Sequence, residues 1–240
     1  MNINSNLQKV KSFVVKGIRF DMILVEGGTF TMGATPEQGD DVYEWEQPAH
    51  KVVLNNYYIC ETVVTQDLWR VVMGNNPSQF KGANLPVENI SWYDCQDFIE
   101  RLNQLTGENF RLPTEAEWEF AARGGNKSMS YKYSGSNNLG TVAWYKIACK
   151  DKTQVVATRT SNELGVYDMC GNVGEWCQDW MYSYSSEPVV NPQGPKRGNS
   201  KIYRGGCYNS TDWDCRISCR FECDPEGKSR YNGFRLALDI

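Results

Sequence analysis

The chain has 240 residues, of which 40% are hydrophobic and 22% are charged, as in an ordinary globular protein. This length fits one large domain, and no linker-like segment interrupts it. The net charge is -4, so no basic surface is expected to hold a phosphate backbone, and no nucleic acid partner is expected. No apolar run approaches the ~20 residues that cross a bilayer, so no membrane span is expected.

Large rings and glycines are frequent, with 8 Trp, 13 Tyr and 21 Gly. This composition favours a loop-rich fold in which aromatic side chains fill an irregular core. The 9 cysteines are odd in number, so free thiols in a reducing compartment are the simplest interpretation. The first residues lack the apolar stretch of a signal peptide. A cytoplasmic protein is therefore expected, with display on a phage or cell surface by another route as the alternative.

The first predicted elements are strands. Residues 1–21 are interpreted as an N-terminal extension or edge element, and residues 22–240 as a single domain. At the start of this domain, β-type runs at 22–25 and 29–32 flank the pair Gly27-Gly28, which predicts a hairpin.

Three helices follow an acidic loop at 35–48 and a strand at 50–58. Each helix begins at a residue that can cap the amide groups of the first turn, twice with an acidic side chain three residues later, as in a capping box. The expected caps are Thr65, Ser91 and Thr114, and the expected stops are Gly74, Gly107 and Gly124. The composition predicts long loops at residues 125–145 and 181–200 and short strands at residues 201–204 and 233–238.

Three long phrases carry a family resemblance. They are Glu61–Trp69 (ETVVTQDLW), Phe110–Gly125 (FRLPTEAEWEFAARGG) and Leu164–Trp180 (LGVYDMCGNVGEWCQDW). Together with a closing frame of RGG and GFRLA, they resemble the formylglycine-generating enzyme, or sulfatase-modifying factor, family. The resemblance implies an α+β, loop-rich C-type lectin-like fold with little regular secondary structure.

The family's enzymes hold Cu(I) between two active-site cysteines, and this chain departs from that pattern. The corresponding positions carry Ser210 and Cys215, so Cys215 alone would be catalytic if the protein were an enzyme. A serine hydroxyl is a hard, weakly acidic group that does not replace a thiolate for Cu(I), so copper is not expected. In an extended segment Cys207 would face the other way from Ser210, because their separation is odd. The prediction therefore leans towards a protein that is not an enzyme.

Calcium is the one cofactor that the resemblance suggests. In the family pattern, Asn172 and Glu175 would bind it with the backbone carbonyls of Cys170 and Val173. The alternative is that Asn172 stabilises its own turn while Glu175 caps a helix or faces solvent.

The last segment, from Arg204 to Ile240, resembles the variable region of proteins encoded by diversity-generating retroelements. In those proteins a fixed frame surrounds residues that adenine-directed mutagenesis can derive from asparagine codons. Several residues inside this frame can be derived from asparagine codons in this way, although Trp213, Glu222, Glu226 and Lys228 cannot. The predicted ligand-binding surface at 207–232 comprises Tyr208, Asn209, Ser210, Thr211, Trp213, Asp214, Ile217, Cys219, Phe221, Glu222, Cys223, Glu226, Lys228, Arg230, Tyr231 and Asn232.

These observations predict a non-catalytic protein whose C-terminal surface binds a protein or glycan ligand, with the rings of Tyr208, Trp213 and Phe221 as anchors. Two alternatives remain open. One is a formylglycine-generating oxidase of sulfatase cysteine, and the other is a divergent, non-mutagenised family member with a structural or interaction role.

Overall fold

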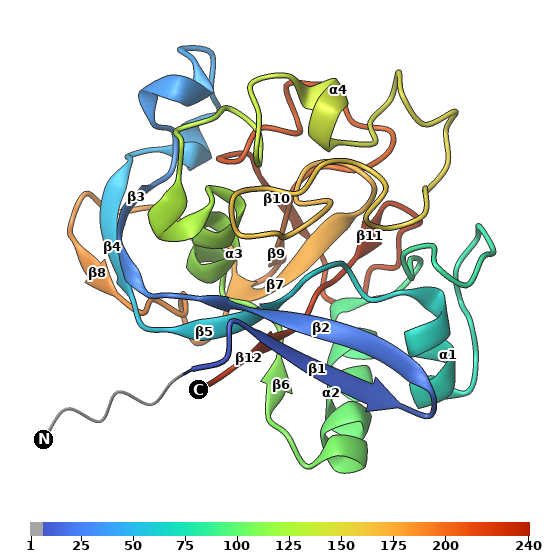
Figure 1. Ribbon diagram of the computed structural model, residues 1–240. Coiled ribbons are helices and arrows are strands. Elements are labelled where there is room, and N and C mark those ends of the chain that lie inside the picture. Colours follow the sequence, from blue (N-terminus) through green and yellow to red (C-terminus); the bar gives the residue numbers. More distant parts are fainter. Residues whose placement is uncertain (1–6) are drawn as a thin grey trace, which may run out of the picture.

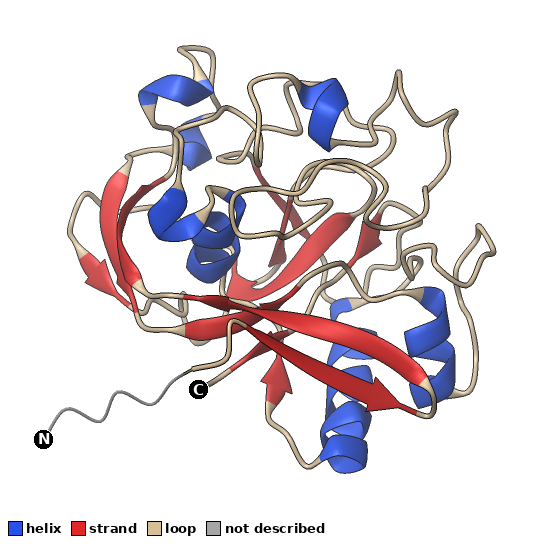
Figure 2. Cartoon of the chain, viewed as in Figure 1, coloured by secondary structure: helices blue, strands red, loops and turns tan. Residues whose placement is uncertain are grey.

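The computed structural model describes residues 7–240. Three small β-sheets and a few short helices are joined by long loops (Figure 1). Figure 2 shows that loop predominates between α3 and β7, where η3 (Gly125–Lys127) and α4 (Leu139–Val142) add short helical turns. The expected α+β, loop-rich architecture is confirmed. No helix within residues 7–240 is long and apolar enough to cross a membrane.

The five-stranded sheet has the order β1-β2-β5-β12-β6. Its strands are β1 (Val10–Val15), β2 (Ile18–Val25), β5 (Tyr57–Cys60), β12 (Ala237–Leu238) and β6 (Phe110–Arg111). The boundary expected at residue 22 lies inside β2, and β1 pairs with β2 from Val10 opposite Ile23. Residues 10–21 are therefore part of the domain, with β1 as its edge strand.

The predicted hairpin around Gly27-Gly28 is wrong. β3 (Gly28–Met32) pairs with β4 (His50–Leu54) in a three-stranded sheet that also contains β8 (Val189–Val190), whereas β2 pairs with β1 and β5. A Cβ on Gly27 would lie 2.3 Å from the Leu54 carbonyl oxygen, so only glycine allows the chain to pass between the two sheets here. The chain therefore does not form a hairpin at Gly27-Gly28: β2 pairs with the strand just before it and with β5, and β3 pairs with the more distant β4.

The third sheet has the order β10-β9-β7-β11 and carries the C-terminal segment. It contains β7 (Gly174–Trp180), β9 (Lys201–Arg204), β10 (Arg220–Cys223) and β11 (Asn232–Gly233). The strand at 201–204 is confirmed. The segment expected at 233–238 forms two short strands, β11 and β12, in different sheets.

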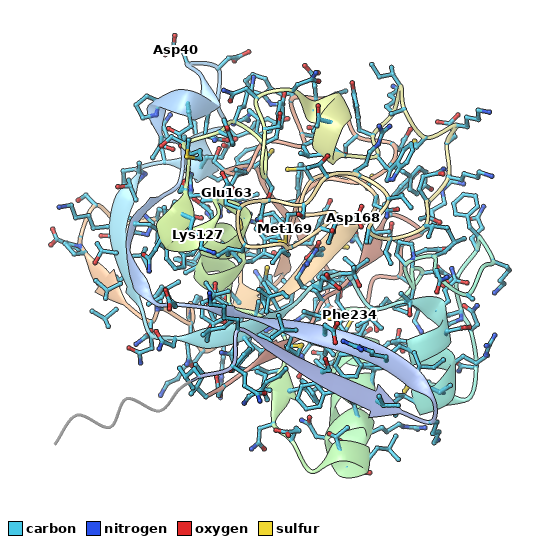
Figure 3. The ribbon with its side chains drawn as sticks, viewed as in Figure 1. Asp40, Lys127, Glu163, Asp168, Met169 and Phe234 are labelled. Atoms are coloured by element: carbon cyan, nitrogen blue, oxygen red, sulfur yellow. The ribbon has the colours of Figure 1, made fainter. Side chains whose placement is uncertain are left out.

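The three predicted helices are confirmed as α1 (Gln66–Met73), α2 (Trp92–Thr106) and α3 (Glu115–Ala122). Ser91 and Thr114 form capping boxes with Asp94 and Glu117. α1 and α2 pack beside the five-stranded sheet, where the rings of Trp69 and Phe98 stack at 5.3 Å. Figures 1 and 3 show α1 and α2 at the lower right, with Phe234 between these two helices and β7. The acidic loop at 35–48 contains η1 (Pro36–Gln38) and η2 (Glu44–Glu46), and Asp40 lies at its outer tip (Figure 3).

Candidate functional site

Buried arginines form the frame of the C-terminal segment. Each guanidinium is paired with a glutamate side chain that is 0% exposed, as in Arg204–Glu119, Arg216–Glu46 (2.8 Å), Arg220–Glu115 (2.6 Å) and Arg235–Glu175 (2.6 Å). Removing one partner would leave an uncompensated buried charge, at a cost of about 3–5 kcal/mol. The frame therefore ties the loops of residues 207–232 to η2, α3 and β7.

A tight turn follows the frame's first strand. Gly205 and Gly206 have φ values of 91° and 69°, in the left-handed region that glycine tolerates. The Ser210 N–H then donates to the Cys207 carbonyl oxygen at 3.0 Å, and the Cys207 N–H donates to Ser210 Oγ at 3.0 Å. The loop is further anchored where the Tyr208 N–H donates to the Asn172 carbonyl oxygen at 2.9 Å.

This turn overturns the prediction that Cys207 faces away from Ser210. Cys207 Sγ lies 3.5 Å from Ser210 Oγ, because the segment doubles back and is not extended. A Cβ on Gly206 would lie 3.1 Å from Cys215 Sγ and 3.2 Å from Ser210 Oγ. Two thiols and one hydroxyl therefore gather around Gly206.

A pocket of about 180 Å³ opens above this turn. The rings of Tyr203, from β9, and Phe221, from β10, stack at 5.2 Å in its wall. The other lining residues come from the turn and from the chain before and at β11: Gly206, Cys207, Asn209, Ser210, Asp214, Tyr231 and Asn232. Tyr203 was not among the predicted site residues. It alternates with the buried Ile202 and Arg204 along β9, so its side chain lies on the other face of the strand.

The predicted ligand-binding residues divide into two groups. Four are buried, with exposed fractions of 1% for Tyr208, 1% for Ile217, 0% for Cys219 and 3% for Asn232. These four positions were predicted as surface, and the structure corrects them, except that Asn232 still lines the pocket. Those at least partly exposed are Asn209, Ser210, Thr211, Trp213, Asp214, Phe221, Glu222, Cys223, Glu226, Lys228, Arg230 and Tyr231.

Tyr208 was expected to anchor the ligand and is instead part of the frame. Its ring packs against Phe80 at 5.6 Å and against Tyr231 at 5.4 Å. Its hydroxyl has no hydrogen-bond partner within residues 7–240, and burial raises its pKa. Phe80 lies far from Tyr208 in the sequence, so no local pattern around residue 208 could have indicated this packing. Trp213 and Phe221 remain as half-buried rings.

Burial raises the pKa of both thiols near Gly206. Burial raises the pKa of Cys215 well above its ordinary value, and Cys215 is 0% exposed. Burial also raises the pKa of Cys207, and this effect is larger than the lowering caused by the hydrogen bond with Ser210. Protonated thiols neither attack electrophiles nor bind metals well. At the two positions implied by the family pattern, the donor set is one buried thiol and one hydroxyl, which does not fit Cu(I).

The residues proposed for calcium are committed to protein partners. The Asn172 amide accepts from the Gln154 N–H at 3.0 Å and donates to the Gln154 carbonyl oxygen at 3.1 Å. The Glu175 carboxylate accepts from Arg235 Nε at 2.6 Å and from Trp118 Nε1 at 2.7 Å. A carboxylate that is already paired and fully buried does not fit Ca²⁺, so Glu175 does not support the expected site, and the backbone carbonyls of Cys170 and Val173 alone are too few ligands for this ion. Glu175 neither caps a helix nor faces solvent.

Residues 13–240 match the sulfatase-modifying factor enzyme 1-like domain. The chain belongs to this family. It is 33% identical over 266 residues to chaperone protein LppX of Paenibacillus barcinonensis, covering 90% of this chain and 88% of LppX. It is 32% identical over 188 residues to the formylglycine-generating enzyme of Streptomyces coelicolor, covering 71% of this chain and 58% of that enzyme.

The solved structure of Treponema denticola variable protein 1 superimposes on this sulfatase-modifying factor-like domain with a TM-score of 0.89. The two chains are 30% identical, and the match covers 98% of this chain and 100% of the variable protein. The expected C-type lectin-like fold and the resemblance to variable proteins are thereby confirmed. Since relatives with this fold are named as an enzyme, a chaperone and a variable protein, family membership alone does not define the activity.

Proposed function

We propose that this family member is a non-catalytic binding protein that recognises its ligand through the pocket and rim formed by residues 203–232. One observation carries the proposal. Where the family's enzymes hold two thiols for Cu(I), this chain has the Ser210 hydroxyl and a fully buried Cys215, and an open pocket lies directly beside them. This chain therefore lacks the pair of accessible thiols that the enzymes use, but it keeps a pocket at the same place.

The composition of the rim supports binding. Trp213 and Phe221 offer large contact area with few rotatable bonds to immobilise, and Asn209, Ser210 and Thr211 offer adaptable hydrogen bonds. The rim rests on the arginine frame, whose ion pairs do not involve these residues. Substitutions at the rim can therefore change the ligand without unfolding the domain. This separation between frame and rim is what a mutagenised variable protein requires, and similarity to the Treponema variable protein supports it.

The test is an unbiased selection from a random peptide display library and a glycan array, with the wild type and a pocket-blocking variant as baits. Asn209 is exposed and lines the pocket, so Asn209→Trp places a ring in the pocket opening, and Asn209→Ala is the matched control. Selected ligands should bind the wild type and Asn209→Ala and should lose binding to Asn209→Trp. Ligands that bind all three proteins equally would contradict the proposed site.

The oxidase alternative has one observation in its favour, which is that the Cys207 thiol lies beside Ser210 and supplies a second sulfur near Cys215. Its test is incubation of the protein with copper, oxygen and a sulfatase peptide containing CxPxR. The proposal expects the cysteine to stay unconverted, as measured by mass spectrometry of the peptide. Formation of the aldehyde would establish the enzyme and overturn the proposal.

A further inference from the structure

The pocket lining has a distinctive chemistry. Three of its residues, Tyr203, Phe221 and Tyr231, are aromatic, and Asp214 is its only charged residue. Aromatic rings present a negative face that attracts cations, by about 0.5–2 kcal/mol per well-placed pair. A carboxylate adds to this attraction.

Asp214 forms no salt bridge with any other described residue of the chain (7–240). One of its carboxylate oxygens, Oδ2, accepts from the Thr211 N–H at 3.2 Å and from Thr211 Oγ1 at 2.8 Å. Across residues 7–240, no Lys or Arg nitrogen forms a salt bridge with its carboxylate within 4.0 Å. Nearby Arg216 is paired with Glu46 inside the frame. The Asp214 charge is therefore available to a ligand.

The hollow beside β6 lacks this combination. This hollow of about 330 Å³ is lined by Arg111, Glu117 and Asp239, which already pair with one another at 2.6 and 2.7 Å. Its charges are satisfied internally, so it offers no unpaired group to a ligand.

We propose that the pocket binds the cationic end of a lysine or arginine side chain on a protein partner. This inference rests on the proposed function and names the ligand's chemistry. The pocket, with a volume of about 180 Å³, has room for the end of one side chain. The ammonium or guanidinium would lie against the aromatic wall and donate to Asp214.

The surface next to the pocket fits a basic partner. The rings of Tyr43 and Trp45 stack at 4.6 Å, and Tyr43 meets the ring of Trp213 edge-on at 6.1 Å. The acidic side chains of Asp40, Asp41 and Glu44 are exposed in the same loop, with Asp40 at its tip (Figure 3). This loop would attract positive charge and offer aromatic area to the residues that flank the bound side chain.

Two cations adjoin the pocket and oppose this ligand. Arg230 donates from Nη2 to the Tyr231 hydroxyl at 2.8 Å and lies 5.0 Å from the ring centroid. Lys146 is exposed, and its backbone N–H donates to the Ser210 carbonyl oxygen at 3.1 Å. Removing the Arg230 charge should therefore strengthen the binding of a cation, whereas removing the Asp214 charge should weaken it.

The experiment titrates capped pentapeptides of sequence Gly-Ala-X-Ala-Gly, where X is Lys, Arg, Met or Glu, against the protein and follows the NMR signals of the pocket residues. The Lys and Arg peptides should bind at least about threefold more tightly than the Met peptide, which has similar length and no charge, and the Glu peptide should be weakest. Equal affinity for the Met or Glu peptide would overturn the inference.

Variants with opposite effects sharpen the test. Asp214→Asn keeps an oxygen acceptor for Thr211 and should lower the affinity for the Lys peptide about three- to tenfold, whereas Arg230→Gln should raise it about two- to threefold. Asp97→Asn removes an exposed charge of the same sign from α2 and should have no effect. An unchanged affinity in Asp214→Asn would overturn the inference.

The inference and the proposed function can fail separately. If peptides from the random library bind the wild type, lose binding to Asn209→Trp and carry no excess of Lys or Arg, the cation inference fails and the proposed site stands. If glycans bind the wild type and lose binding to Asn209→Trp, while no peptide does, the proposed ligand class, a basic side chain of a protein, is wrong. If the selected ligands ignore Asn209→Trp, the proposed site itself fails.

Discussion

Tyr208 was predicted to be a surface anchor for the ligand, but the structure places it among the buried residues of the C-terminal segment. Its side chain is 1% exposed, and its ring packs against Phe80 and Tyr231. Truncating a buried aromatic ring loses its transfer free energy and leaves a cavity, so Tyr208→Ala should lower the free energy of unfolding by about 3–5 kcal/mol. For a domain of this size, that corresponds to a fall in Tm of about 6–20 °C.

Two further variants make this prediction specific. Tyr208→Phe removes a hydroxyl that has no partner within residues 7–240, so it should be neutral or slightly stabilising. Trp213→Ala removes a half-buried ring that contacts Arg216 at 4.2 Å and should cost about 1 kcal/mol. Urea unfolding followed by circular dichroism measures all three. A loss for Tyr208→Ala no larger than that for Trp213→Ala would refute the assignment of Tyr208 to the frame.

Two predictions concern buried carboxylates. Burial, together with the charge of Glu115, raises the pKa of Asp179 to about 7, so stability should fall as pH rises from about 4 to 7. Burial also raises the pKa of Asp168, to about 6, so Asp179→Asn should reduce this fall, measured as the difference between urea midpoints at pH 5 and 8, and should not abolish it; an unchanged difference would contradict the assignment. Burial opposes ionisation of Glu46, but hydrogen bonds from Arg216 and Ser218 prevail and lower its pKa, so Glu46 stabilises the fold at neutral pH and loses this effect in acid. Glu46→Gln should cost about 3–5 kcal/mol at pH 7, and a loss below about 1 kcal/mol would show that the Arg216 pair is not part of the frame.

The helices could be predicted because their signals are local. Thr65, Ser91 and Thr114 each accept a hydrogen bond from an amide of their own first turn, so a few neighbouring residues determine where each helix begins. The family phrases gave the fold class for a related reason, since they are long and ordered along the chain.

Strand pairing and burial could not be predicted in the same way. The hairpin predicted around Gly27-Gly28 is wrong because β2 pairs with the preceding β1 and with β5, while β3 pairs with the distant β4. Tyr208 was misplaced because distant Phe80 packs against it. Cys207 was misplaced because two glycines with positive φ convert an expected extended segment into a turn. That Asp214 has no salt-bridge partner among residues 7–240 is visible only when its neighbours in space are known. Local signals thus located the segment, and long-range packing decided which of its side chains face the pocket.

The central claim is that the pocket beside Ser210 binds a ligand and performs no oxidation. The most direct test measures the dissociation constant of the strongest selected ligand for the wild type, Asn209→Ala and Asn209→Trp by isothermal titration calorimetry. The pocket assignment predicts that Asn209→Ala stays within about threefold of the wild type, while Asn209→Trp weakens binding by about a hundredfold or more, as expected when a buried contact of ~2.7 kcal/mol or more is lost. Equal dissociation constants for the wild type and Asn209→Trp would contradict it.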